Sequence, residues 1–326
     1  MSVQSSECWC PENRGKVIRD MSWVRATRTK KRSPTVEEFH FRSDNPFLCL
    51  LLNRRTRSIR LIDFRVGAHP AKRMYVQAVA QREGIEKVII LVEKQEVSAW
   101  TRVGFVREGT VPGFYKNSDG YLVGCVINDK TASIEVSNAG QKLAEQTVGA
   151  AKREAEDIKQ VLHGIRVKAT SEKRALTARD LVWDRNVDAL GTFDNFGRDA
   201  TRLFVESVPK KGRTNFLSAE FQDCFSHSLV EVLKLPKTDA EVLGVVAGLR
   251  AVNEELIRRN IVSAFAFAPS NHIGLGTAFI AAGYRKTGLL ANGVVAGGKR
   301  SDAILWTRRL IDPRDGEVSD DDDPGQ

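Results

Sequence analysis

The sequence lacks any run of about twenty apolar residues, so it predicts no helix long enough to span a membrane. Residues 1–34 contain no continuous apolar segment of the kind found in secretory signals. Cysteine is also scarce, and Cys8, Cys10, Cys49, Cys125 and Cys224 are odd in number and widely scattered. They predict no disulfide framework, so a reducing cytoplasm is the simplest expected location.

Charge is unevenly distributed along the chain, whose formal net charge is +9. Between Met1 and Pro34, eight lysines and arginines stand against three acidic residues. A basic arm of this kind could bind nucleic acid, anionic lipid or an acidic protein partner, although a solvated tail explains the charge more simply. Residues 1–37 are therefore expected to be a disordered basic arm. The aspartates at 320–323 predict an acidic disordered tail over 312–326.

Hydrophobic periodicity predicts an α/β segment over 38–128. An amphipathic helix lies between two apolar strands and a third strand whose continuous apolar run is typical of burial on both faces. A short helix and two closing strands follow. The expected strands are 47–52, 59–66, 88–92, 105–111 and 121–127, and the expected helices are 71–79 and 97–103.

Residues 129–164 change in composition to Ala, Glu, Lys and Gln, which predicts a solvated connecting helix over 144–161 that has little to bury. A second α/β segment follows over 165–311. Its expected strands are 165–168, 203–205, 216–222, 228–235, 262–268, 286–292 and 303–307, with helices beginning near Thr170, Val242 and Ile273.

Both segments repeat one order of elements, and each contains an aromatic residue after a glycine that ends a short helix: Trp100-Thr-Arg-Val-Gly-Phe105 and Phe279-Ile-Ala-Ala-Gly-Tyr284. In this order and in these phrases the chain resembles the GNAT superfamily of N-acetyltransferases. Val111-Pro-Gly-Phe-Tyr115, Ser218-Ala-Glu220 and the segment 283–292 are also similar to the β-lysine N-acetyltransferase family. The resemblance implies a mixed α/β fold with two GNAT-like domains, the first truncated (38–128) and the second more complete (165–311), joined by the helical linker 129–164.

The resemblance also implies acetyl-CoA as the donor, bound where a glycine-rich loop opens the helix after the fourth strand. Here that loop has no glycine before Gly244, and Asp239 and Glu241 place negative charge where phosphates would lie. The residues expected to contact the donor in this loop are Val232, Leu233, Leu235, Lys237, Thr238 and Ala240. Ser270 and Asn271 are expected either to contact the pantetheine arm or to cap the next helix.

Acyl transfer to an amine requires a base, because an ammonium group has a pKa near 10.4 in water. Glu220 matches the family's Ser-Ala-Glu and is the expected base, with Asp223 nearby in sequence. A solvated carboxylate on an antiparallel strand is the alternative for Glu220. Tyr115 and Tyr284 are candidates to protonate the departing thiolate, or else packing residues with satisfied hydroxyls.

Two functions therefore remain open at the level of sequence. One is an acetyl-CoA-dependent N-acetyltransferase acting on a small amino acid, a polyamine or a protein lysine. The other is an inactive GNAT-like interaction or regulatory module that has lost cofactor binding. No metal site is expected, because Cys8-Trp-Cys10 has no second ligand pair at zinc spacing. Gly293 to Gly298 lacks the Lys-Ser/Thr of a phosphate-binding loop.

Overall fold

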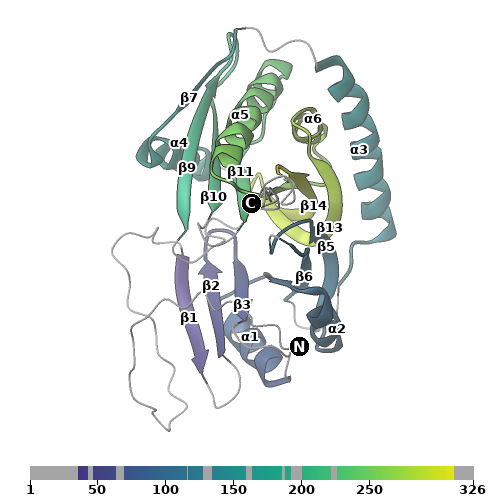
Figure 1. Ribbon diagram of the computed structural model, residues 1–326. Coiled ribbons are helices and arrows are strands. Elements are labelled where there is room, and N and C mark those ends of the chain that lie inside the picture. Colours follow the sequence, from purple (N-terminus) through teal and green to yellow (C-terminus); the bar gives the residue numbers. More distant parts are fainter. Residues whose placement is uncertain are drawn as a thin grey trace, which may run out of the picture.

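The computed structural model describes residues 36–42, 47–63, 70–115, 117–127, 134–158, 164–185, 188–191, 200–221 and 226–311. These residues form one mixed sheet of 14 strands accompanied by six helices (Figure 1). The expected mixed α/β fold class is therefore confirmed. The basic arm before Val36, the acidic tail after Ile311 and the residues 64–66 of an expected strand lie outside the described residues.

The N-terminal half of the sheet, drawn in purple to blue at the bottom of Figure 1, follows the expected order of elements. Helices α1 and α2 cover one face of it, and Tyr75, Val76, Val79 and Trp100 pack there against strand residues. The elements are β1 (Val36–Arg42), β2 (Phe47–Asn53), β3 (Ser58–Asp63), α1 (Pro70–Arg82), β4 (Lys87–Val92), α2 (Lys94–Arg102), β5 (Val106–Val111) and β6 (Gly120–Val126). Strand β1 was not predicted, and it begins within the range expected to be a disordered arm.

The C-terminal half, in teal to yellow, contains helix α5, which is longer than α1 of the N-terminal half. One apolar stripe of α5 is fully buried and consists of Val245, Val246, Leu249, Val252 and Leu256. The stripe has the spacing of one helix face, which explains why the sequence pattern predicted it. The elements are β7 (Arg166–Ala169), α4 (Glu172–Asp184), β8 (Leu190–Gly191), β9 (Thr201–Val208), β10 (Asn215–Phe221), β11 (His227–Val232), α5 (Asp239–Arg258), β12 (Ser263–Pro269), α6 (Ile273–Ala281), β13 (Arg285–Ala296) and β14 (Lys299–Arg309).

Apart from the edge strand β7, the sheet path has the same pattern when it is followed from either end. It runs β1-β2-β3-β4-β6-β5-β13-β14-β12-β11-β10-β9-β7, with β8 beside β13. In each half one neighbouring pair is parallel, β3 with β4 and β11 with β12, and each parallel pair is joined by a long helix. The repeat that the sequence pattern indicated is thus present in the strand order. The division into two domains at residues 38–128 and 165–311 stays a prediction.

The two halves meet where β5 pairs with β13, and the paired residues there are Gly109 and Gly288. A Cβ added to Gly288 would lie 2.4 Å from the carbonyl oxygen of Glu108 and 2.6 Å from the Cα of Gly109. Both contacts are with backbone atoms, which cannot rotate away. Glycine is therefore required for the strands to approach this closely.

Helix α3 (Asn138–Ile158) connects the halves and lies along α6 at the right of Figure 1. The expected connecting helix is present and most of its residues are exposed, but it buries more than the sequence predicted. Ala144, Thr147, Ala151 and Ala155 form a buried stripe of small side chains. A Cβ added to Gly276 of α6 would lie 3.3 Å from the Cβ of Ala151, so small residues on both helices permit the close packing.

Candidate functional site

Strands β11 and β12 separate from each other partway along their length. They pair at His227–Ser263, Ser228–Ala264 and Leu229–Phe265, and no further pair joins them, although β11 continues to Val232 and β12 to Pro269. Over the whole of its length β12 remains paired with β14 on its other side. The sheet therefore divides at Leu229 and Phe265, and the gap opens towards the carboxyl ends of two parallel strands, which is a common location for ligand sites in α/β proteins.

A pocket of about 870 Å³ lies at this opening, between the N-terminal ends of α5 and α6. The loop after β11 and the first turns of the two helices line it, and α3 forms a further wall through Glu154 and Asp157. Of the residues expected to contact the donor, Leu235, Lys237 and Thr238 line the pocket. Val232 and Leu233 are buried in the core, Ala240 lies in the first turn of α5, and Asn271 is exposed.

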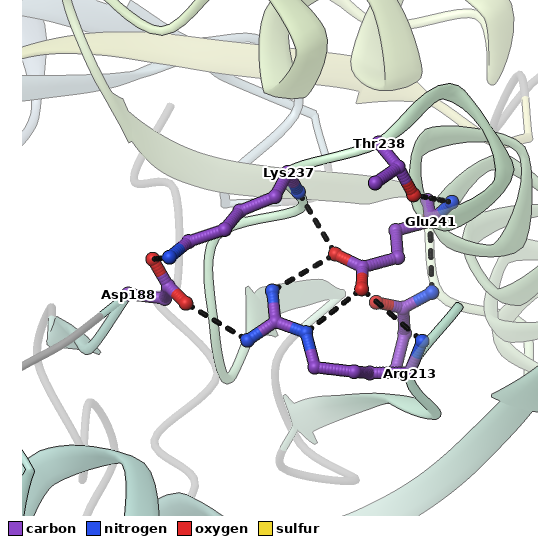
Figure 2. A network of polar contacts seen from close by, with 6 residues as sticks. Asp188, Arg213, Lys237, Thr238 and Glu241 are labelled. Carbon is purple, nitrogen blue, oxygen red and sulfur yellow. Dashed lines mark hydrogen bonds and ion pairs between the residues drawn. The ribbon is translucent and has the colours of Figure 1, made fainter.

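The loop that opens α5 is held by a network centred on Glu241 (Figure 2). Thr238 is the N-cap of α5, and its hydroxyl accepts a hydrogen bond from the amide of Glu241. The Glu241 carboxylate accepts hydrogen bonds from the amide of Lys237 at 2.8 Å and from the amide of Arg213 at 3.1 Å. Two further bonds come from the guanidinium of Arg213, through Nε at 2.8 Å and Nη2 at 3.0 Å.

This network strongly stabilises the charged form of Glu241. Burial by itself would raise the pKa of Glu241, but hydrogen bonds from Arg213 and from the two amides outweigh it and lower the pKa to about 2. Asp188 forms ion pairs with both Arg213 and Lys237, each at 2.8 Å. Burial by itself would raise the pKa of Asp188, but these contacts outweigh it and lower the pKa. The Thr-x-x-Glu spacing at 238–241 is a capping motif that sequence inspection could have identified, whereas Arg213 could not have been found that way.

The opening of α6 differs from the expectation. The helix is capped by His272, whose Nδ1 accepts a hydrogen bond from the amide of Leu275 at 3.0 Å. Capping by Ser270 or Asn271 was therefore wrong. Ser270 follows β12 directly, is nearly buried, and donates its amide to the carbonyl oxygen of Asp302 at 2.9 Å. His272, Gly274 and Thr277 line the pocket and were not predicted.

Glu220 lies beside the point where the sheet divides. It pairs with Leu229, the last residue of β11 that still contacts β12 through the ladder, and residues directly opposite in a sheet point to the same face. The alternative of a solvated carboxylate was wrong, because Glu220 is only 7% exposed. Arg202 donates to its Oε2 from Nε at 2.9 Å and from Nη2 at 2.5 Å. Asp223, the other acidic candidate, lies outside the described residues.

The turn between β5 and β6 in the N-terminal half covers the same part of the sheet. The ring of Phe114 stacks on that of His227, with centroids 3.6 Å apart, and the Phe114 carbonyl oxygen lies 3.2 Å from Nδ1 of His227. Burial, together with the charge of Arg60, lowers the pKa of His227 to about 3, so the imidazole is neutral at pH 7. Because a carbonyl oxygen can only accept, Nδ1 carries the proton in this contact.

Neither candidate tyrosine lines the pocket. The hydroxyl of Tyr115 donates to the carbonyl oxygen of Leu91 at 3.2 Å, and the hydroxyl of Tyr284 donates to Oδ1 of Asn253 at 2.8 Å. Burial raises the pKa of both phenols. Both hydroxyls are therefore satisfied within the core, in line with the packing alternative.

Within the described residues, no helix combines the length and apolar character needed to cross a bilayer. In the same part of the chain, no three histidine, cysteine or acidic side chains gather closely enough to hold a metal ion.

No protein-family model matches the sequence, and no curated protein matches it. Part of the chain is similar in structure to solved acetyltransferases. A spermidine N-acetyltransferase from Vibrio cholerae, in complex with CoA and spermine, is 9% identical with a TM-score of 0.36, over 46% of this chain and 98% of that one. The ribosomal-protein-S18-alanine N-acetyltransferase from Escherichia coli is 12% identical with a TM-score of 0.32, over 45% of this chain and 94% of its own. An N-acetyltransferase from Staphylococcus aureus is 15% identical with a TM-score of 0.33, over 45% of this chain and 98% of its own.

Proposed function

We propose that the chain is an N-acetyltransferase that transfers an acetyl group from acetyl-CoA to an amine. The observation that carries the proposal is the division of the sheet between β11 and β12, together with the 870 Å³ pocket that the segments following these strands line at the N-termini of α5 and α6. A thioester arm entering from the pocket would reach Leu229 and Phe265 at the end of the gap. The unpaired edges of the two strands would offer it backbone hydrogen bonds.

The amine acceptor would approach the division from the side of the N-terminal half. Glu220 pairs with Leu229 at the division, and we assign it the role of accepting the proton from the attacking ammonium. Arg202 fixes the orientation of the carboxylate through its two hydrogen bonds. The turn that carries Phe114 would then form one wall of the acceptor site. A small amino acid, a polyamine or a protein lysine remains a suitable acceptor.

The donor side of the pocket fits acetyl-CoA only in part. In favour, the amides of Asp239 and Ala240 in the first turn of α5 have no acceptor among the described residues, and the helix dipole attracts negative charge there. Against it, the acidic residue Asp239 lines the same pocket, and the amide of Lys237 is already bonded to Glu241. We therefore expect the two free amides to hold phosphate oxygens, and the affinity to be limited by repulsion from Asp239.

A second candidate function, an inactive interaction or regulatory module, is favoured by one observation. The Glu241 carboxylate occupies donors from two loops, in the manner in which a phosphate would occupy them. If these contacts never open, the loop cannot hold a nucleotide. The two functions predict opposite results for acetyl-CoA binding.

The test is calorimetric titration of acetyl-CoA into the full chain and into two matched variants. Asp239→Asn and Glu172→Gln each remove an acidic residue directly after the N-cap of a helix, so both lose a similar interaction with the helix dipole. Only Asp239 lines the pocket. We expect Asp239→Asn to bind acetyl-CoA several-fold more tightly than the parent chain, and Glu172→Gln to bind as the parent does.

Absence of heat and of any shift in melting temperature at millimolar acetyl-CoA, in the parent and in Asp239→Asn, would exclude the enzyme and leave the regulatory module. Where binding is found, Glu220→Gln tests the base. We expect a fall in kcat of about 10²-fold or more with unchanged acetyl-CoA affinity. An unchanged kcat would remove Glu220 from the mechanism.

A further inference from the structure

The division between β11 and β12 is enclosed at its open end by a short crossing segment, residues 188–191, which we call the strap. On one side Ala189 pairs with Lys234, which follows β11 in the chain. On the other side β8, the last two residues of the strap, pairs with the end of β13. Because β13 pairs with β14 and β14 with β12, these pairings form a closed ring around the division, and the strap completes it.

Two backbone hydrogen bonds fasten the strap, one on each side. The amide of Leu235 donates to the carbonyl oxygen of Asp188 at 2.9 Å, and the amide of Gly297 donates to the carbonyl oxygen of Ala189 at 2.9 Å. The strap pairs through a single bridge on one side and a two-residue strand on the other. Pairings this short open more easily than the long ladders of the main sheet.

A carboxylate at the start of the strap joins it to the loop before α5 (Figure 2). Oδ1 of Asp188 pairs with Nζ of Lys237, and Oδ2 pairs with Nη1 of Arg213, each at 2.8 Å. The Asp188 side chain is 9% exposed, whereas those of Lys237 and Arg213 are 51% and 45% exposed. An anion from solution can therefore reach the two cations, although the carboxylate between them is nearly buried.

The backbone of Asp188 depends on these contacts as well. Its φ is 62°, in the left-handed region that residues other than glycine seldom adopt. Such a conformation costs free energy and persists where the surrounding contacts maintain it. Loss of one ion pair should therefore favour a different backbone conformation at the start of the strap.

The phosphates of a donor and the carboxylate of Asp188 compete for one cation. Lys237 is the only lysine or arginine among the described residues that line the 870 Å³ pocket. In this part of the chain its ammonium forms no ion pair except that with Asp188. Glu154, Asp157 and Asp239 also line the pocket, so phosphates that enter it are attracted chiefly by Lys237 and by the helix amides.

We propose that Asp188 is a positioning residue that keeps the strap closed until Lys237 pairs with the phosphates of the donor instead. This role of Asp188 rests on the proposed function, since it requires acetyl-CoA in the pocket. Once Lys237 pairs with a phosphate, Arg213 alone holds Asp188, and its guanidinium is already shared with Glu241. The strap then loosens at the open end of the division, where the thioester arm has to enter.

Hydrogen exchange at single amides of the full chain measures the release of the strap. With acetyl-CoA at a concentration that calorimetry shows to be saturating, we expect exchange of the Leu235 and Gly297 amides to become at least about fivefold faster. The amide of Leu233, which donates to the carbonyl oxygen of Phe216 outside the strap, should not become faster. A ligand that merely covered the strap would slow the exchange, so the sign of the change distinguishes release from covering. S-acetylpantetheine, which has the thioester arm without phosphates, should leave all three amides unchanged.

Substitution of Asp188 by asparagine removes the charge and keeps the size of the side chain, and asparagine tolerates the same φ. In Asp188→Asn the two strap amides, those of Leu235 and Gly297, should exchange rapidly without ligand, and acetyl-CoA should add little. Asp180→Asn is the matched control, because Asp180 pairs with Arg55 and neither residue lines the pocket. It should respond to acetyl-CoA as the parent does.

Substitution of Lys237 by glutamine gives a second test at a half-exposed position. It leaves Arg213 alone with Asp188, as in the donor-bound protein. Both strap amides should therefore exchange as fast without ligand as they do in the parent saturated with acetyl-CoA, and acetyl-CoA should not change them further.

Absence of heat at millimolar acetyl-CoA would remove the proposed function and this role of Asp188 together. Heat with unchanged or slower exchange at the two strap amides would refute the role of Asp188 alone and keep the proposed function. Equal acceleration by S-acetylpantetheine, or exchange in Asp180→Asn as fast as in Asp188→Asn, would also refute it.

Discussion

Replacement of Glu241 by glutamine tests the network in Figure 2, because it removes the negative charge and keeps the size of the side chain. Four donors converge on the carboxylate, two of them backbone amides and two from Arg213. The Glu241 side chain is 3% exposed, so water cannot replace those contacts without local opening. We expect the β9–β10 turn and the loop before α5, which the carboxylate joins, to loosen together.

The size of the effect follows from the pKa. A fall from 4.5 to about 2, at about 1.4 kcal/mol per pKa unit, corresponds to roughly 3 kcal/mol of stability at neutral pH. Removing one partner of a buried ion pair costs about 3–5 kcal/mol. Because Arg213 is 45% exposed and can be rehydrated, we expect Glu241→Gln to lose about 2–3 kcal/mol.

The pH dependence of the Glu241 contribution to stability follows from the difference in its pKa between the folded and unfolded states. The pKa of Glu241 is lower in the folded protein than in the unfolded chain, so its contribution is present above pH 4.5 and is lost as the pH falls towards 2. The difference in stability between the parent and Glu241→Gln should therefore be constant from pH 7 to about pH 5 and shrink below that.

The assay is denaturant unfolding at several pH values, combined with hydrogen exchange at the amides of Lys237 and Arg213. Glu255→Gln is the matched control, because Glu255 lies on the same helix and pairs with Arg258 and Arg259 at the surface. We expect it to lose less than about 1 kcal/mol. A loss for Glu241→Gln no greater than that of the control, or one that does not change between pH 7 and pH 3, would refute the reasoning.

Three further substitutions test the packing that positions the site. Gly288→Ala should lose more than about 2 kcal/mol, because its Cβ would meet the backbone beside Gly109; unfolding indistinguishable from that of the parent would contradict the close approach of β5 and β13. Tyr284→Phe should lose about 1–3 kcal/mol by leaving Oδ1 of Asn253 without its donor, and below the melting temperature it should leave any acetyl transfer unchanged. A selective loss of kcat would instead make Tyr284 catalytic. Ala151→Leu should lose about 1–3 kcal/mol by overpacking α3 against α6, and a stability gain would show that the contact has room.

Much of the fold could be predicted because its elements have strong local patterns. The continuous apolar run of β4 is typical of a strand buried on both faces, and the stripe of α5 follows a period of 3.6 residues. Both patterns are visible within a short stretch of sequence. Strand β1 was missed because Val36–Arg42 follows a basic arm and has only three apolar residues, Val36, Phe39 and Phe41. The burial of α3 was missed because alanine contributes little hydrophobicity, although it permits close helix packing.

Only some features of the candidate site could be predicted from the sequence. Thr238 and Glu241 are three residues apart, so a local capping motif could have been recognised. The negative charge of Asp239, at a position where phosphates are expected, was also evident from the sequence. The contact of Glu241 with Arg213 spans 28 positions, and the wall that α3 contributes to the pocket comes from a segment expected to be a linker. Neither is encoded in any short stretch of residues.

The sequence by itself determined the order of most elements, the approximate positions of the helices and the repeated pattern, because these depend on propensity and periodicity within a few residues. Only the tertiary structure decided that Glu220 is buried beside the division of the sheet, that Glu241 and not a ligand holds the loop before α5, and that Glu108 is enclosed where the halves meet. The physical reason is that burial and pairing of charged groups depend on side chains brought together from distant parts of the chain, and no local pattern specifies those partners.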